Sequence, residues 1–359
     1  MSNTLDSNKN LWSYHAGWLD SPLFDSIFIF GLTAIAILSG AIVFIWPELF
    51  YPVLTLDVIL LGYHHVIATY TKLVGTKEDR KEYFFLIYIL PIIVIAAVVA
   101  LYFFIGSWII VSIYFFWQWY HYTRQSYGIG VFYQRKSKKA SDNKKSLLSH
   151  LVIWSIPVWG VLHRCNQGWE TFIYSEIYLP HVPDIAVTCA MVIAIISLFW
   201  WVYSKVLAYK NGNLSIAQTA YTTSHILIFS VGYIIINDIT VGWLVANIWH
   251  NAQYIMFVWL YNVNRSSKIK NDNKKSILDS LLIRKPKEIL YYFFFTFSIS
   301  FIFYTGLHQG FDFIAGTTGI LISNLYIIGF QTVNFHHYVV DSFIWKAKNK
   351  KNQEILNVK

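Results

Sequence analysis

The sequence is poor in charged residues. Only 13% of its 359 residues are Asp, Glu, Lys or Arg, whereas a soluble globular domain carries roughly 25%. At the same time, 56% of the residues are hydrophobic and 19% are aromatic. This composition excludes an ordinary water-soluble domain and indicates that most of the chain lies in lipid.

Features of several other protein classes are also absent. The two cysteines, Cys165 and Cys189, form no CxxC pair, which argues against a thiolate metal site. The sequence leaves open whether they form a disulfide. Gly128 and Gly130 are isolated and do not form the fingerprint of a flavin or nicotinamide site. Residues 1–23 are polar and lack the hydrophobic core of a signal peptide.

What the sequence does contain is a series of long apolar segments. A helix needs about 20 apolar residues to cross the hydrocarbon core of a bilayer. We therefore predict an all-α, polytopic bundle of about ten transmembrane helices. Residues 24–345 would form one membrane domain between a cytoplasmic segment, 1–23, and a basic cytoplasmic tail, 346–359. The predicted spans lie near 24–46, 52–74, 84–105, 107–129, 148–165, 183–205, 215–238, 240–263, 289–308 and 313–345.

The positive charges support this topology. If the amino terminus is inside, all 28 Lys and Arg residues except Arg124 and Arg164 fall in segments that are then cytoplasmic. One missed helix would scatter these charges over both sides of the membrane. We therefore expect both termini in the cytoplasm and the protein in a bacterial inner membrane. The net charge of +9 is then explained by topology and lipid headgroups, and not by nucleic acid.

Histidines gather inside the predicted spans. At a rise of about 1.5 Å per residue, most of them lie roughly 10–22 Å from the cytoplasmic ends of their helices and so share a layer. Ionisable groups are costly in a bilayer and usually mark function. We therefore predict a shared metal. The candidate ligands are His64, His65, His121, His250, His336 and His337, with His225 at a similar depth and His150 at the shallow edge.

Other polar residues accompany these histidines at helical spacing. Asn247, His250, Asn251 and Tyr254 follow the i, i+3, i+4, i+7 pattern, which places them on one face of a helix. Asp341 follows His337 by one turn, where a carboxylate can orient an imidazole. Arg124 either grips a carboxylate or phosphate headgroup or reaches toward the inner interface. The residues predicted to surround the metal or to contact the substrate are Arg124, Gln125, Asn247, Asn251, Tyr254, Asn334 and Asp341.

The type of ligand limits the choice of metal. Imidazole-rich sites suit iron, copper or zinc, whereas the scarcity of buried carboxylates argues against magnesium, calcium and manganese. Histidines on facing helices also hold haem b, but one such pair suffices for a haem. We predict non-haem iron, as one or two ions, with copper, zinc or haem b as alternatives.

This combination of many membrane helices and clustered histidines resembles the membrane histidine-box oxidoreductases, which include fatty-acid desaturases, hydroxylases and alkane monooxygenases. It is also similar to the membrane carotene-cleaving dioxygenases of the Brp/Blh type. The histidine-box spacing HxxxH followed by two HxxHH motifs is absent; His64-His65, His121, His250 and His336-His337 stand in its place. The resemblance implies an oxygenase, hydroxylase or desaturase that uses non-haem iron and dioxygen on a hydrophobic or lipid-like substrate. If electrons are consumed, a separate donor would supply them.

Two other function classes stay open. A metal or solute transporter would fit ten spans, although the two halves show no internal repeat. A membrane acyltransferase would use one histidine and one asparagine, which His250 and Asn251 offer. The leading hypothesis is an enzyme, a membrane-embedded metal oxidoreductase.

Overall fold

The protein is built almost entirely of helices. The computed structural model describes residues 17–137, 143–268 and 286–358, and it is 84% helical, which confirms the predicted all-α class. The strand content of these residues is one short antiparallel hairpin, in which β1 (Thr171–Phe172) pairs with β2 (Ser175–Glu176).

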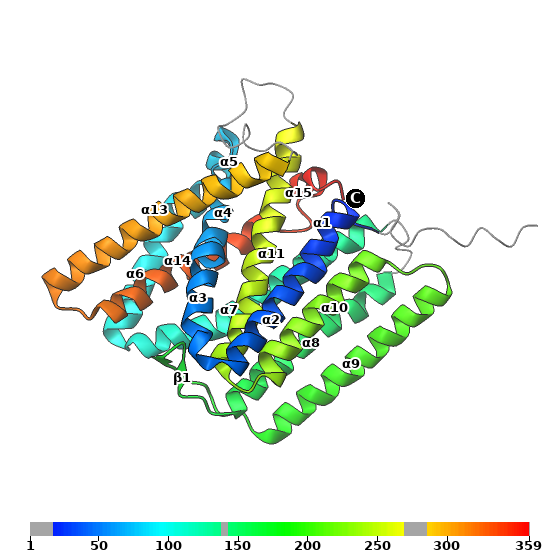
Figure 1. The fold of residues 1–359 in the computed structure, drawn as a ribbon, viewed down its shortest axis with the longest axis horizontal. Coiled ribbons are helices and arrows are strands. Elements are labelled where there is room, and N and C mark those ends of the chain that lie inside the picture. The colour runs from blue at the N-terminus through cyan, green and yellow to red at the C-terminus, as the bar shows by residue number, and fades with distance from the viewer. Residues whose placement is uncertain (1–16, 138–142, 269–285, 359) are drawn as a thin grey trace, which may run out of the picture.

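Figure 1 shows the order and arrangement of the helices. The first half of the chain contains α1 (Pro22–Ser26), the π-helical turn η2 (Ile27–Gly31), α2 (Leu32–Ile45), the 3-10 turn η3 (Pro47–Leu49), α3 (Phe50–Asp57), the π-helical turn η4 (Val58–Gly62), α4 (Tyr63–Leu73), α5 (Lys77–Glu82), the π-helical turn η5 (Phe85–Ile89), α6 (Leu90–Phe104), α7 (Ser107–Lys136) and α8 (Asn143–Asn166). After the hairpin come α9 (Asp184–Lys210), α10 (Ile216–Ser230), the π-helical turn η6 (Val231–Ile235), α11 (Ile239–Lys268), α13 (Pro286–Thr318), α14 (Ile322–Ile344) and α15 (Lys350–Ile355).

Several helices have the composition of membrane spans. Only 17% to 39% of the residues in their most apolar windows are buried, so large apolar side chains cover their outer faces. Extensive exposed apolar surface of this kind is typical of a membrane protein. Among the described residues, five segments are long and apolar enough to cross a membrane: Pro22–Ile45, Pro47–Leu73, Phe85–Phe104, Asp184–Lys210 and Leu290–Thr318.

Helix α11 lies in the interior of the bundle. It packs against α2, α4, η6 and α10, and in Figure 1 it crosses the middle of the molecule between α4 and α2. Nearly all of its side chains are buried, including those of Asn247, His250, Asn251 and Gln253. Because neighbouring helices surround it, α11 carries polar groups that would be costly on a lipid-facing helix.

The boundary between the last two long helices lies farther along the chain than predicted. We expected one span to end near residue 308, but α13 continues as a helix to Thr318. Gly306, His308 and Gly310 therefore do not interrupt it. The chain turns at Gly319, whose φ of 71° lies in the left-handed region that glycine adopts at helix ends without steric cost.

The two cysteines are not linked. Cys165 is buried in α8 and Cys189 is exposed on α9, and both are free. The disulfide that the sequence left open is therefore absent.

Arg164, one of the two cations outside the predicted cytoplasmic segments, has a structural role. Its guanidinium is fully buried and donates hydrogen bonds to the carbonyl oxygens of Gly232, Ile236 and Asn237. These carbonyls lie at the end of α10 and η6, where a helix leaves acceptors without partners. Arg164 thus caps this helix end from α8.

The basic tail packs against the bundle. The ammonium group of Lys72, in the last turn of α4, donates to the carbonyl oxygen of Ile344 and to Oδ1 of Asn352. It also lies 3.7 Å from the centroid of the Trp345 ring. Lys351 forms an ion pair with Asp79. These contacts fasten the tail to α4 and α5 and hold Trp345 against the interior.

Candidate metal centre

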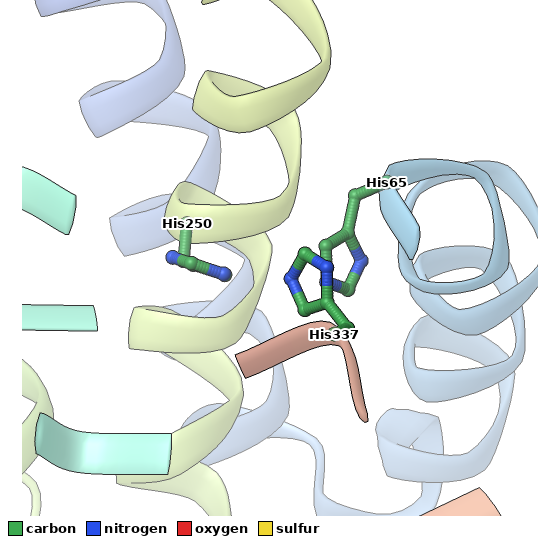
Figure 2. A group of neighbouring side chains, drawn as sticks. All are labelled: His65, His250 and His337. Atoms are coloured by element: carbon green, nitrogen blue, oxygen red, sulfur yellow. The ribbon is translucent and has the colours of Figure 1, made fainter. Parts of the chain in front are cut away.

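Four histidines from four helices meet inside the bundle. His65 comes from α4, His121 from α7, His250 from α11 and His337 from α14. Their ring centroids form a closed circuit, with separations of 4.8 Å from His65 to His337, 5.1 Å to His121, 4.9 Å to His250 and 5.5 Å back to His65. None of the four is more than 6% exposed. Figure 2 shows three of them, which reach this space from α4, α11 and α14.

The local structure of the second predicted span brings His65 to this point. The π-helical turn η4 immediately precedes α4, and such turns frequently occur at functional sites because they re-orient the side chains that follow. At Gly62, a side chain would lie 3.7 Å from the Asn251 amide. This is ordinary van der Waals contact, so η4 packs directly against α11, with His65 three residues farther along the chain.

Asp341 adds a carboxylate to the four imidazoles. It follows His337 by one helical turn, and its Oδ2 lies 3.6 Å from Nε2 of His337 and 3.8 Å from Nε2 of His121. Two overlapping sets of potential ligands result: His65 with His250 and His337, and His121 with His337 and Asp341. Within each set the ligand atoms lie within 4.8 Å of one another. Ligands about 2.1 Å from one ion are at most about 4.2 Å apart, so small side-chain rotations bring either set to bonding distance.

A chain of hydrogen bonds determines which nitrogen of His337 carries the proton. Trp345 donates to the hydroxyl oxygen of Tyr254, and Tyr254 donates its own proton to Oδ1 of Asp341. The Thr69 hydroxyl, 2.8 Å from the Tyr254 oxygen, must therefore donate to it, and it accepts a hydrogen bond from Nδ1 of His337. Nε2 of His337 is left with a free lone pair, which faces Oδ2 of Asp341. Two acceptors facing each other repel unless a proton or a metal ion lies between them.

Seven potential ligand atoms of this cluster have no hydrogen-bond partner in the described part of the chain. Buried polar atoms almost always have a partner, and so many orphans in one place require an explanation. A metal ion fits them, because it binds imidazole nitrogen and carboxylate oxygen atoms. The seven atoms are both ring nitrogens of His65 and of His250, Nε2 of His121 and of His337, and Oδ2 of Asp341.

Two of the other predicted ligands use both ring nitrogens in bonds to the protein. His225 is bonded to the Ser126 hydroxyl at 2.8 Å and to the carbonyl oxygen of Ile153 at 2.9 Å. His336 is bonded to the Tyr70 hydroxyl at 2.9 Å and to a backbone carbonyl at 2.8 Å. Both histidines tie helices together and lie outside the two ligand sets.

His64 and His150 also lie outside these sets. Nε2 of His64 is bonded to the Thr296 hydroxyl of α13, and His150 packs its ring against Tyr127. Neighbouring residues of a helix point about 100° apart, so one member of each His-His pair enters the centre while the other contacts an adjacent helix.

The predicted polar neighbours divide into four groups. Asn247 and Asn251 donate to the buried carboxylate of Asp57, and Asn247 also accepts a hydrogen bond from Tyr122, whose ring stacks on His250 at 4.0 Å. They support the centre indirectly. Tyr254 is bonded to Asp341, as described above. Arg124 and Gln125 line a cavity that reaches His121, whereas Asn334 is bonded to Gln331 and is not connected to the centre.

The sequence did not identify Thr69 as a site residue. A signal was present, because Thr69 follows His65 by four residues and therefore lies on the same face of α4. Trp345 was missed as well, because its role depends on the packing of the tail.

Replacing Thr69 with valine is expected to weaken metal binding by about tenfold. Valine keeps the shape of the side chain but cannot hold the proton of His337 on Nδ1, and loss of such an outer partner typically costs 10–100-fold in metal affinity. Competition with a chelator measures the affinity. The matched control is Thr123→Val, because Thr123 is equally buried and bonds to its own helix. Equal affinities in the two variants would contradict the role of Thr69.

Comparison of the chain with known protein families, curated proteins and solved structures found no match. The site is therefore interpreted from its own residues and geometry.

Proposed function

We propose that this protein is a membrane-embedded, histidine-ligated metal oxidoreductase that uses dioxygen on a hydrophobic, lipid-like substrate. The observation that carries the proposal is the closed circuit of four buried histidines beside Asp341, in which seven ligand atoms have no partner. Ionisable groups placed inside a membrane bundle usually serve function. A purely structural role would leave those atoms unsatisfied.

The donor set favours iron. His121, His337 and Asp341 provide two histidines and one carboxylate, which is the donor set of non-haem iron(II) oxygenases. His65 and His250 add two further imidazoles. Both ligand sets share His337, and only Nε2 of this residue is free to bind. One ion per chain, bound by residues of both sets, is therefore the simplest arrangement.

The surrounding residues would prepare the site for this chemistry. Ferrous iron held by these residues would supply the electrons that activate dioxygen. Thr69 keeps the proton of His337 away from the ion, and Tyr254 orients Asp341. Burial of all five donors excludes bulk water, which strengthens electrostatic interactions inside the site. Because the sequence has no flavin or nicotinamide fingerprint, electrons beyond those of the substrate would come from a separate donor protein.

The spacing of the rings argues for a non-haem site. A haem b held by two histidines needs one imidazole on each face of a flat macrocycle. Here four rings are neighbours at 4.8–5.5 Å, and the Asp341 carboxylate lies between two of them. These neighbours leave no plane for a macrocycle.

A ten-span topology with both termini in the cytoplasm accompanies this proposal. Besides the five strongly apolar segments, α7, α8, α10 with η6, α11 and α14 are long helices whose polar side chains face the interior. The distribution of Lys and Arg supports a cytoplasmic position for the ends of α4, α7, α11 and α14, and we propose a bacterial inner membrane as the location.

Elemental analysis of the purified protein, combined with its optical spectrum, tests the proposal. We expect about one iron per chain and no Soret band, and we expect the reduced protein to consume dioxygen when membrane lipids are added. Folded, monodisperse protein that contains less than a tenth of a metal ion per chain would overturn the metal centre. Stoichiometric zinc or copper would retain the centre but overturn the assignment of iron.

A further inference from the structure

Two cavities meet at His121 and Arg124. The first has a volume of about 150 Å³ and reaches His121 and Asp341. It also contacts Lys346, just beyond the end of α14. It therefore extends from the metal centre toward the end of the bundle where the positive charges gather.

The second cavity, of about 180 Å³, lies between α7 and α14. It shares His121, Arg124 and Ser342 with the first, and its other lining residues are Trp117, Tyr120, Tyr338 and Val339. Tyr120 is 43% exposed on the outer face of α7, which the bilayer covers in the proposed topology. Trp117 precedes Arg124 by two turns, or roughly 10 Å. This cavity thus runs from the centre toward the lipid.

Arg124 has binding capacity that the described protein does not use. A guanidinium has five N–H donors, and Arg124 makes one hydrogen bond to the described residues, to the carbonyl oxygen of Ser342. No ion pair forms between it and a carboxylate of the same residues. A guanidinium in such a position binds a carboxylate or phosphate through two parallel hydrogen bonds.

We propose that the substrate is an anionic amphiphile whose headgroup binds Arg124. The carboxylate or phosphate oxygens lie at Arg124, where the two cavities meet, and the hydrocarbon chain lies along their aromatic lining past His121 toward the bilayer. This inference rests on the proposed function, because it places the chain beside the metal ligands. It explains why two cavities lined by aromatic side chains share both Arg124 and His121.

Equilibrium binding of labelled amphiphiles to the full-length protein in neutral detergent tests the headgroup assignment. Oleate should bind at least tenfold more tightly than oleyl alcohol, which has the same chain and no charge. Arg124→Gln should weaken oleate binding about tenfold and leave oleyl alcohol binding and metal content unchanged, while Arg124→Lys should give an intermediate affinity. The matched control is Arg135→Gln, because Arg135 lies on the same helix, bonds to Ala347 and does not line either cavity.

The outcomes separate the headgroup site from the metal centre. Oleoyl lysophosphatidate that binds more tightly than oleate would assign a phosphate headgroup, and the reverse would assign a carboxylate. Metal-loaded protein that binds oleate and oleyl alcohol equally, or a folded Arg124→Gln variant that keeps full oleate affinity, would overturn the headgroup site alone. Metal-free protein that still prefers oleate would support this site while refuting the proposed metal centre.

Discussion

Replacing His250 with alanine is expected to abolish metal binding. His250 lies on the interior helix α11, and its ring is a neighbour of both His65 and His121 in the circuit. Both of its nitrogens lack a hydrogen-bond partner among the described residues, so both are available to bind an ion. Loss of a ligand should exceed the roughly 10–100-fold effect of losing an outer partner. Metal content per chain should therefore fall more than tenfold, and dioxygen consumption should fall with it.

The control for this experiment is His225→Ala. His225 is as buried as His250, but its two nitrogens bond to Ser126 and Ile153. The His225 variant should lose thermal stability, because its partners remain buried without a hydrogen bond, and should still retain its metal. If His250→Ala kept its metal, or if both variants lost metal equally, the centre would not lie where we place it.

Much of the fold could be predicted because the signal is local. A long apolar segment predicts a membrane helix whatever its neighbours are, and the structure has long helices wherever the sequence predicted spans. The less accurate boundaries lie where local signals conflict. Gly306 and Gly310 weaken the helical pattern of α13, but the helix continues because unpaired backbone groups are costly in lipid. The break occurs at Gly319 instead.

The depth of the histidines in the membrane could be predicted from the sequence, but the direction in which each side chain points could not. Counting residues from the cytoplasmic ends placed the histidines in one layer, yet depth does not say which way a side chain points. His65 and His337 lie in the circuit, whereas their neighbours His64 and His336 bond to adjacent helices. That choice depends on the rotation of each helix, which the π-helical turn η4 and interhelical packing determine.

The residues that support the ligands were the hardest to predict. Thr69 and His337 are 268 positions apart, and the link between them exists only because α4 packs against α14. Trp345 reaches Tyr254 because Lys72 and Asn352 fasten the tail. Asp341 was the exception, since it follows His337 by one helical turn and its proximity is a local property.

Asp341→Asn is expected to lower metal affinity by more than the roughly 10–100-fold that loss of an outer partner costs. The substitution keeps the size of the side chain but removes the negative charge that balances a cation bound by neutral imidazoles. It also disturbs the hydrogen bond that the Tyr254 hydroxyl donates to this carboxylate in the wild-type protein. The anionic Oδ2, 3.6 Å from His337 and 3.8 Å from His121, is lost from the one ligand set that contains a carboxylate.

Asp57→Asn separates this effect from the general consequences of neutralising a buried carboxylate. Asp57 is also buried, but it accepts hydrogen bonds from Asn247 and Asn251 and belongs to neither ligand set. Its replacement should reduce stability, because the new amide NH2 group would then face the NH2 group of Asn247 or Asn251. It should leave metal affinity unchanged in a chelator titration. If both variants bound metal as well as the wild type, Asp341 would not be a ligand, and a purely histidine-bound ion would explain the site better. Unchanged affinity in Asp341→Asn with a loss in Asp57→Asn would instead move the metal toward Asn247 and Asn251.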